Sequence, residues 1–127
     1  MLKKATQFES AVFFNNGDGT YKKQILPIEI QLSPVRDIQT GDFNEDGIPD
    51  LLVAGNNYST RPSLGRQDAS YGWLMPGNET FAYKILWPNE SGLSMAGDMR
   101  KMHLIELEDE SVLVSLTNNG YLETFKY

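Results

Sequence analysis

The chain repeats a pattern of turn and strand residues after about 60 positions. The turn at residues 17–21 and the Ile-Leu pair at 25–26 match the turn at 77–81 and the Ile-Leu pair at 85–86. Self-similarity at such a spacing is typical of repeat architectures, in which each unit buries its apolar face against the next unit. We therefore expect the chain to fold as stacked copies of one small unit.

A second pairing covers the other half of the unit. Residues 35–38 correspond to 99–102, and residues 51–57 correspond to 113–119, because each of the last two segments leads from apolar residues to an Asn-Asn pair. The offsets of the pairings differ by a few positions, as loops of different length would produce. The assembled unit reads as strand, acidic loop, strand, long loop, strand, tight turn and strand.

Short apolar or alternating runs favour β-strands over helices throughout the chain. Six Tyr, six Phe and two Trp fit pleated structure, and eleven Gly with six Pro indicate frequent turns. No segment shows a helical stripe. The strands are expected at residues 11–14, 21–27, 35–43, 50–54, 72–75, 81–87, 99–107, 111–117 and 121–127.

These strands predict an all-β fold built from four-stranded antiparallel blades, as a partial β-propeller of about two to three blades. Residues 1–34 would form half a blade, residues 35–88 a complete blade with the acidic loop, and residues 89–127 an incomplete blade. Such a set does not close into a ring, and open edges are a liability in water. The missing blades are expected from a parent protein or from self-association.

Composition excludes several classes of function. The net charge is −6 and the eleven Lys and Arg are scattered, which argues against a nucleic-acid partner. The chain has no Cys, so disulfides and thiolate metal sites are excluded. No apolar run approaches the roughly 20 residues of a membrane-spanning helix, and no signal-peptide core is recognised in residues 1–9.

The acidic loop at residues 42–50 has oxygen-bearing side chains at its first, third, fifth and ninth positions. They are those of Asp42, Asn44, Asp46 and Asp50. A loop that curls around Ca²⁺ presents alternate side chains inward, and Gly47 allows the sharp reversal. At the seventh position Ile48 would contribute its backbone carbonyl, because its side chain cannot coordinate. The spacing therefore predicts one Ca²⁺ site.

An EF-hand and a plain hairpin turn are two other interpretations of this loop. An EF-hand requires a Glu at position twelve and flanking helices, whereas Val53 occupies that position here, within an apolar run. A plain hairpin turn with solvated carboxylates is the simpler alternative. Three carboxylates and an amide at alternate positions would repel one another without a cation, which favours the metal site.

Residues 41–53, which contain this loop and the apolar run after it, resemble the calcium-loop signature of FG-GAP or VCBS repeats. Such repeats occur in integrin α-subunit propellers and in many bacterial surface proteins. The turn at residues 15–21 is similar to a second element of that family. Residues 65–72 further resemble the C-terminal repeats of bacterial proteins that pair such propellers with an ASPIC/UnbV-type module.

The resemblance implies a seven-bladed propeller, an extracytoplasmic location, and Ca²⁺ held by Asp42, Asn44, Asp46, the Ile48 carbonyl and Asp50. The corresponding position of the last repeat differs from this pattern. It carries Glu106, Glu108 and Glu110 without the Gly and the final Asp, so no metal is predicted there.

No catalytic centre is recognisable from residue spacing. His103 is the only His, and no Ser or Cys nucleophile can be paired with it from the sequence. The predicted function is therefore a non-enzymatic scaffold for extracellular adhesion or ligand binding, with a protein or glycan as its ligand. A carbohydrate-binding or polysaccharide lyase fragment, with Trp73 and Trp87 lining a sugar groove, is the alternative.

Overall fold

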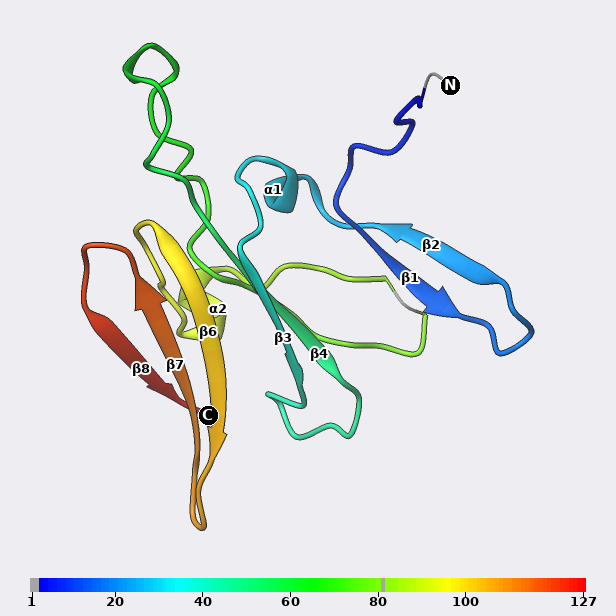
Figure 1. Cartoon of the computed structure of the whole chain (residues 1–127). Coiled ribbons are helices and arrows are strands. Elements are labelled where there is room, and N and C mark those ends of the chain that lie inside the picture. Colours follow the sequence, from blue (N-terminus) through cyan, green and yellow to red (C-terminus); the bar gives the residue numbers. More distant parts are fainter. Residues whose placement is uncertain (1–2, 81) are drawn as a thin grey trace.

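A computed structural model describes residues 3–80 and 82–127, which form eight strands in three antiparallel sheets (Figure 1). The first sheet is the hairpin of β1 (Ala11–Asn15) and β2 (Tyr21–Ile25). The second has the order β3-β4-β5 and the third the order β6-β7-β8. The all-β fold with small antiparallel sheets is confirmed.

The middle sheet consists of β3 (Asp37–Gly41), β4 (Asp50–Ala54) and β5 (Trp73–Met75). Every residue of β4 is buried, so both faces of this sheet are covered. The third sheet consists of β6 (Met99–Glu106), β7 (Ser111–Thr117) and β8 (Leu122–Lys126). Its strands are joined by tight turns, whereas β4 and β5 are separated by a long loop.

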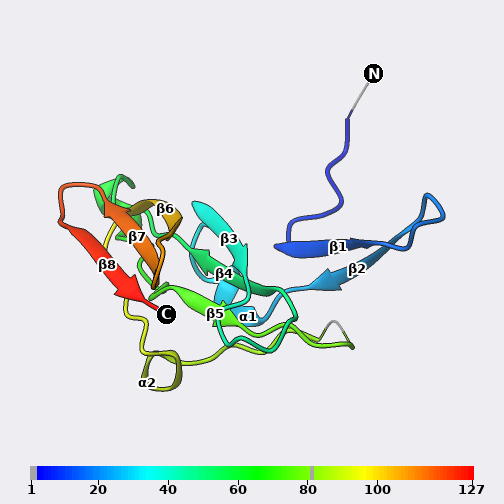
Figure 2. The ribbon, with the colours of Figure 1, turned by 90° about the horizontal axis from the view of Figure 1, so that it is seen from below.

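The three sheets are stacked in chain order, with the middle sheet between the other two (Figures 1 and 2). Because side chains alternate along a strand, each face of the middle sheet belongs to a different apolar cluster. The cluster toward the hairpin includes Leu51, Val53, Trp73 and Met75 with Leu26 and Ile30. The cluster toward the third sheet includes Leu52, Ala54 and Leu74 with Met95, Met99, Met102 and Leu113.

Three short helical segments lie in the connections. They are α1 (Ile28–Gln31), the 3-10 turn η1 (Pro62–Leu64) and α2 (Pro88–Ser91). Each is about one turn long, too short to leave a periodic pattern in the sequence. Within the described residues, no helix has the length and apolar character needed to cross a membrane.

The fourth strand expected in the middle sheet, at residues 81–87, differs from the expectation. Residue 81 lies outside the described residues, and from 82 onward the segment forms a single bridge, between Leu74 and Leu86. The strand it would pair with, β5, is three residues long and is followed by Pro76, which has no amide hydrogen to donate. Tyr83 and Ile85 nevertheless pack on the apolar cluster beside the hairpin.

Candidate metal centre

The acidic loop joins β3 to β4, and its ends are held together by the antiparallel pairing of Gly41 with Asp50. Within the loop, Glu45 and Gly47 have backbone φ angles of 59° and 83°. Both values lie in the left-handed region, which Gly adopts without steric cost. The chain can therefore reverse within residues 42–49 and bring side chains from both arms of the loop together.

The carboxylate of Asp42 accepts hydrogen bonds from two amides on the opposite side of the loop. Its Oδ1 lies 3.0 Å from the Asp46 N, and its Oδ2 lies 2.8 Å from the Gly47 N. The side-chain Oδ1 of Asn44 accepts from the same Asp46 amide at 3.1 Å. One shared N–H donor thus places oxygens of the first and third loop positions beside each other.

Asp46 completes this group of oxygens. Its Oδ1 accepts from the Ile48 N–H at 2.8 Å, and its Oδ2 accepts from the Asn44 Nδ2 at 3.0 Å. The side chains of Asp42, Asn44 and Asp46 are all solvent-exposed. The structure therefore brings three of the five expected ligands together in a loop that is open to ions from solution.

Asp50 has a different environment, because it is only 1% exposed. Its Oδ2 accepts from the Phe43 N–H at 2.9 Å and its Oδ1 from the Gly77 N–H at 2.8 Å. Hydrogen bonds from amides to an ionised carboxylate are stronger than neutral ones. Asp50 therefore connects the start of the acidic loop to the turn that follows β5.

Gly77 is a residue of this site that the spacing of acidic residues did not predict. A Cβ at this position would lie 2.3 Å from the Pro49 carbonyl oxygen and 2.7 Å from the Ile48 Cγ2. Only Gly allows this close approach of the β5 turn to the loop. The signal available in the sequence was the internal repeat, in which Gly77 corresponds to Gly17.

The donor set of the loop suits a hard cation, since every expected ligand is an oxygen. A carboxylate oxygen that accepts one amide hydrogen bond keeps a second lone pair for a metal. Among residues 3–80 and 82–127, however, no group of three or more His, Cys, Asp or Glu side chains is arranged as a metal site. Asp50 and the Ile48 carbonyl stay predicted ligands.

Residues 35–75 match the family model of the FG-GAP repeat. This segment is therefore similar to an FG-GAP repeat. The matched segment runs from just before β3 to the end of β5, so it contains the whole middle sheet and the acidic loop. Neither curated proteins nor solved structures gave a match to the chain. The resemblance of residues 65–72 to ASPIC/UnbV-associated proteins stays a prediction.

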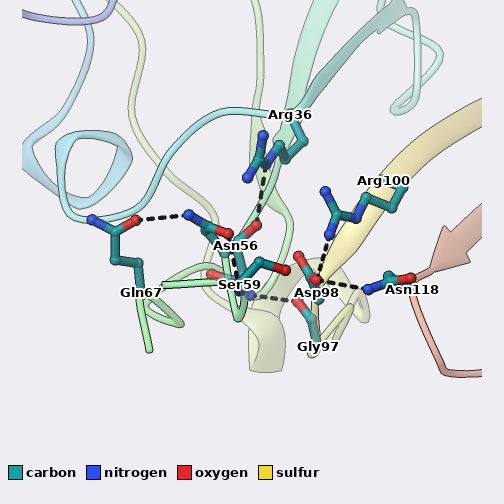
Figure 3. A network of polar contacts seen from close by, with 9 residues as sticks. Arg36, Asn56, Ser59, Gln67, Gly97, Asp98, Arg100 and Asn118 are labelled. Carbon is teal, nitrogen blue, oxygen red and sulfur yellow. Dashed lines mark hydrogen bonds and ion pairs between the residues drawn. The ribbon is translucent and has the colours of Figure 1, made fainter. Parts of the chain in front are cut away.

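Polar side chains connect the middle sheet and the loop after β4 to the third sheet (Figure 3). The buried Asn56 follows β4; its Nδ2 donates to the Ser70 and Gly97 carbonyl oxygens, each at 2.9 Å, and its Oδ1 accepts from the Ser70 N–H at 3.0 Å. Asn118, the corresponding residue of the last repeat, donates to Asp98 at 3.1 Å. Asn56 and Asn118 thus both hold residues 97–98, the segment that leads into β6.

A second polar contact joins the two sheets at Asp37, the first residue of β3. Its Oδ1 lies 2.7 Å from the Lys101 Nζ, and its Oδ2 accepts from the Met102 N–H at 2.6 Å. Burial raises the pKa of Asp37, but the hydrogen bonds from Lys101, Met102 and Gln39 outweigh it, so the net pKa lies below its ordinary value. Asp37 is therefore held ionised between two strands.

The remaining candidate residues are separate from the acidic loop. Trp73 is buried in the cluster beside the hairpin, with its ring 5.5 Å from that of the half-exposed Trp87 in an edge-on arrangement. Trp73 therefore fills space between sheets and does not line a sugar groove. His103 is exposed in β6, opposite Val114.

Proposed function

We propose that this chain is a calcium-stabilised, non-enzymatic FG-GAP propeller module that scaffolds adhesion or ligand binding outside the cell. FG-GAP repeats are generally non-enzymatic binding modules and typically occur in extracellular proteins. The observation that carries the calcium proposal is the shared Asp46 amide, which gathers oxygens of Asp42 and Asn44 inside a loop of the matched segment.

In this proposal Asp42, Asn44 and Asp46 are the ligands already gathered, and Asp50 and the Ile48 carbonyl complete the set. Bound Ca²⁺ would supply positive charge to a loop that holds three aspartates and would fix the connection between β3 and β4. The chain's own contribution is the left-handed turn at Gly47, which brings the ligands to one side. The role of the ion is structural, because it would strengthen the fold of one repeat.

The test is thermal unfolding with about 1 mM CaCl₂ and with a chelator, since extracellular calcium modules bind with dissociation constants of about 0.1–1 mM. A ligand at ten times its dissociation constant stabilises the folded state by about 1.4 kcal/mol, which corresponds to a few degrees in melting temperature. We expect the unchanged protein to show this increase and Asp46→Ala to lose it.

Asp68→Ala is the matched control, because Asp68 is an exposed aspartate of the loop between β4 and β5. This variant should keep the full calcium response. Identical melting curves of the unchanged protein with calcium and with chelator would overturn the assignment. Magnesium at the same concentration tests selectivity, since Mg²⁺ requires octahedral geometry with shorter ligand distances than Ca²⁺.

A further inference from the structure

A groove lies between the loop that joins β4 to β5 and the turn that joins β7 to β8. Its volume is about 700 Å³, within the range of about 300–1,000 Å³ that small-molecule sites occupy. The side chains that line it include those of Tyr58, Ser59, Arg66, Asp98, Asn119 and Tyr121. The β4-β5 loop begins at the end of β4 opposite to the acidic loop, so the groove is separate from the candidate metal centre.

Asp98 lies on the wall of this groove and is only 2% exposed. Its Oδ2 accepts hydrogen bonds from the Arg100 Nη2 at 2.6 Å and from the Asn118 Nδ2 at 3.1 Å, and both contacts end on this one oxygen (Figure 3). Its Oδ1 is buried and accepts no hydrogen bond from any residue that the structure describes. Because a buried acceptor without a donor costs free energy, this oxygen indicates a donor that comes from outside the chain.

The segment before β6, which carries Asp98, is held in place by contacts within the chain. The Gly97 carbonyl oxygen accepts from the Nδ2 of the buried Asn56 at 2.9 Å, and the Asp98 carbonyl oxygen accepts from the Asn118 N–H at 2.9 Å. Gly97 has a φ of 104°, in the region that favours Gly, and a Cβ there would lie 2.7 Å from the Thr117 Cγ2. This wall of the groove is therefore preformed, which lowers the entropic cost of binding.

The charges at the groove are balanced, which indicates an uncharged ligand. The Arg100 guanidinium neutralises the Asp98 carboxylate. The exposed side chains of Arg66 and Glu123 add one charge of each sign. A charged ligand of either sign would therefore meet a like charge as well as an opposite one. The donor that the Asp98 Oδ1 lacks is accordingly expected from a neutral group such as a hydroxyl.

The other side chains of the groove suit a ligand that carries several hydroxyls. The exposed Ser59 hydroxyl and Asn119 amide each offer a donor and an acceptor. The Tyr121 side chain is 88% exposed, and the Arg66 guanidinium lies 4.6 Å from the centre of the Tyr58 ring. The C–H face of a sugar ring packs on an aromatic ring, while its hydroxyls exchange hydrogen bonds with amide and carboxylate groups. A neutral saccharide therefore matches both the charge and the polar groups of this groove.

We propose that this groove binds a neutral saccharide, with one sugar hydroxyl donating to the Asp98 Oδ1 and the sugar ring packed on Tyr121. The inference rests on the proposed binding function and names its class of ligand. The site differs in place from the sugar groove expected at Trp73 and Trp87, since Trp73 is buried beside the hairpin. The groove includes no residue of the acidic loop, so saccharide binding is expected with calcium and with chelator alike.

Isothermal titration calorimetry with a panel of neutral methyl glycosides tests this assignment. The panel comprises hexoses, 6-deoxyhexoses, pentoses and N-acetylhexosamines, as monosaccharides and as disaccharides. At least one should bind with a dissociation constant of about 1 mM, because a ligand with few atoms makes few contacts. Tyr121→Ala should weaken this binding about tenfold. Tyr21→Ala is the matched control, because Tyr21 is a 62% exposed tyrosine of β2 outside the groove, and it should bind like the unchanged protein.

Asp98→Asn tests the hydrogen bond itself, because Asn has nearly the size of Asp but lacks the carboxylate. It should weaken binding about tenfold or more. Among monodeoxy derivatives of the bound glycoside, one should bind the unchanged protein about tenfold more weakly than its parent and bind Asp98→Asn as well as its parent does. Far-UV circular dichroism would confirm that the variant is folded. If it is not, Tyr121→Ala and the deoxy series on the unchanged protein provide the test.

Absence of binding by every glycoside of the panel would overturn the proposal, and so would binding that Asp98→Asn and Tyr121→Ala both retain. Binding of uncharged peptides in this groove in place of glycosides would overturn it as well. The calcium response of the melting temperature is a separate readout, and Asp98→Asn should keep it. Loss of that response with saccharide binding retained would contradict the calcium site alone. A retained calcium response without saccharide binding would contradict the groove alone.

Discussion

The connection between the first two strands is an acidic loop in the middle sheet and a tight turn in the third sheet. Residues 42–49 separate β3 from β4, whereas only residues 107–110 separate β6 from β7. In the turn, the Leu107 N–H donates to the Glu110 carbonyl oxygen at 2.9 Å. In the loop, side-chain carboxylates accept the amide hydrogens.

The two sheets differ in which groups accept the backbone amide hydrogen bonds between their first two strands. In the third sheet the strands are longer, eight and seven residues against five and five, so backbone pairing extends almost to the turn. In the middle sheet the pairing ends earlier, and aspartates and an asparagine replace it. The middle sheet therefore depends on charge at this junction, and the third sheet does not.

The largest expected effect comes from Asp50, the buried carboxylate of the acidic loop. Asp50→Ala leaves the amides of Phe43 and Gly77 without their acceptor, which should lower the free energy of unfolding by about 2–4 kcal/mol. Denaturant unfolding measures this loss. It should persist in chelator, whereas a loss seen only with calcium would mean that Asp50 acts only through the metal.

A smaller effect is expected at Asp37, where the middle sheet meets the third sheet. Its pKa is lower in the folded protein, so its contribution to stability is present above the unfolded pKa and is lost as the pH falls through the folded pKa. Asp37→Asn should therefore cost about 1 kcal/mol near neutral pH and make the loss of stability at acid pH shallower. Unfolding curves between about pH 2 and 7 would show it.

Gln39→Glu provides a contrast to Asp37→Asn, because Gln39 donates a hydrogen bond to the same carboxylate. A second negative charge beside Asp37 should raise the pKa of Asp37, so that the loss of stability at acid pH begins at a higher pH. If the unchanged protein and Asp37→Asn lost stability equally as the pH falls, Asp37 would not be the group responsible for that loss.

The smallest effect is expected in the turn of the third sheet. The Glu110 carboxylate lies 2.5 Å from the Lys126 Nζ, and both side chains are substantially exposed. Exposed pairs of this kind contribute about 0–1 kcal/mol. Glu110→Gln should change the melting temperature by little and leave any calcium response unchanged. A large loss of stability would show that this turn also depends on charge.

Much of the fold could be predicted from local patterns. Short apolar or alternating runs located all eight strands of the described residues to within a few positions. Apolar and polar residues also alternate after Phe81. This pattern indicates which side chains are buried, but it does not indicate whether the backbone pairs with a neighbouring strand. Tyr83 and Ile85 are packed as a strand would pack them, although one bridge alone joins this segment to β5.

The acidic loop contains contacts that the sequence determines and a contact that only the tertiary structure decides. The sequence by itself determined that Asp42, Asn44 and Asp46 gather around Gly47, because these contacts span a few residues and follow from local backbone geometry. Only the tertiary structure decided that Asp50 accepts the amide of Gly77, since that contact depends on how β5 is placed beside β4. The same holds for the two apolar clusters on the faces of the middle sheet, because burial of a side chain is decided by which sheet covers it.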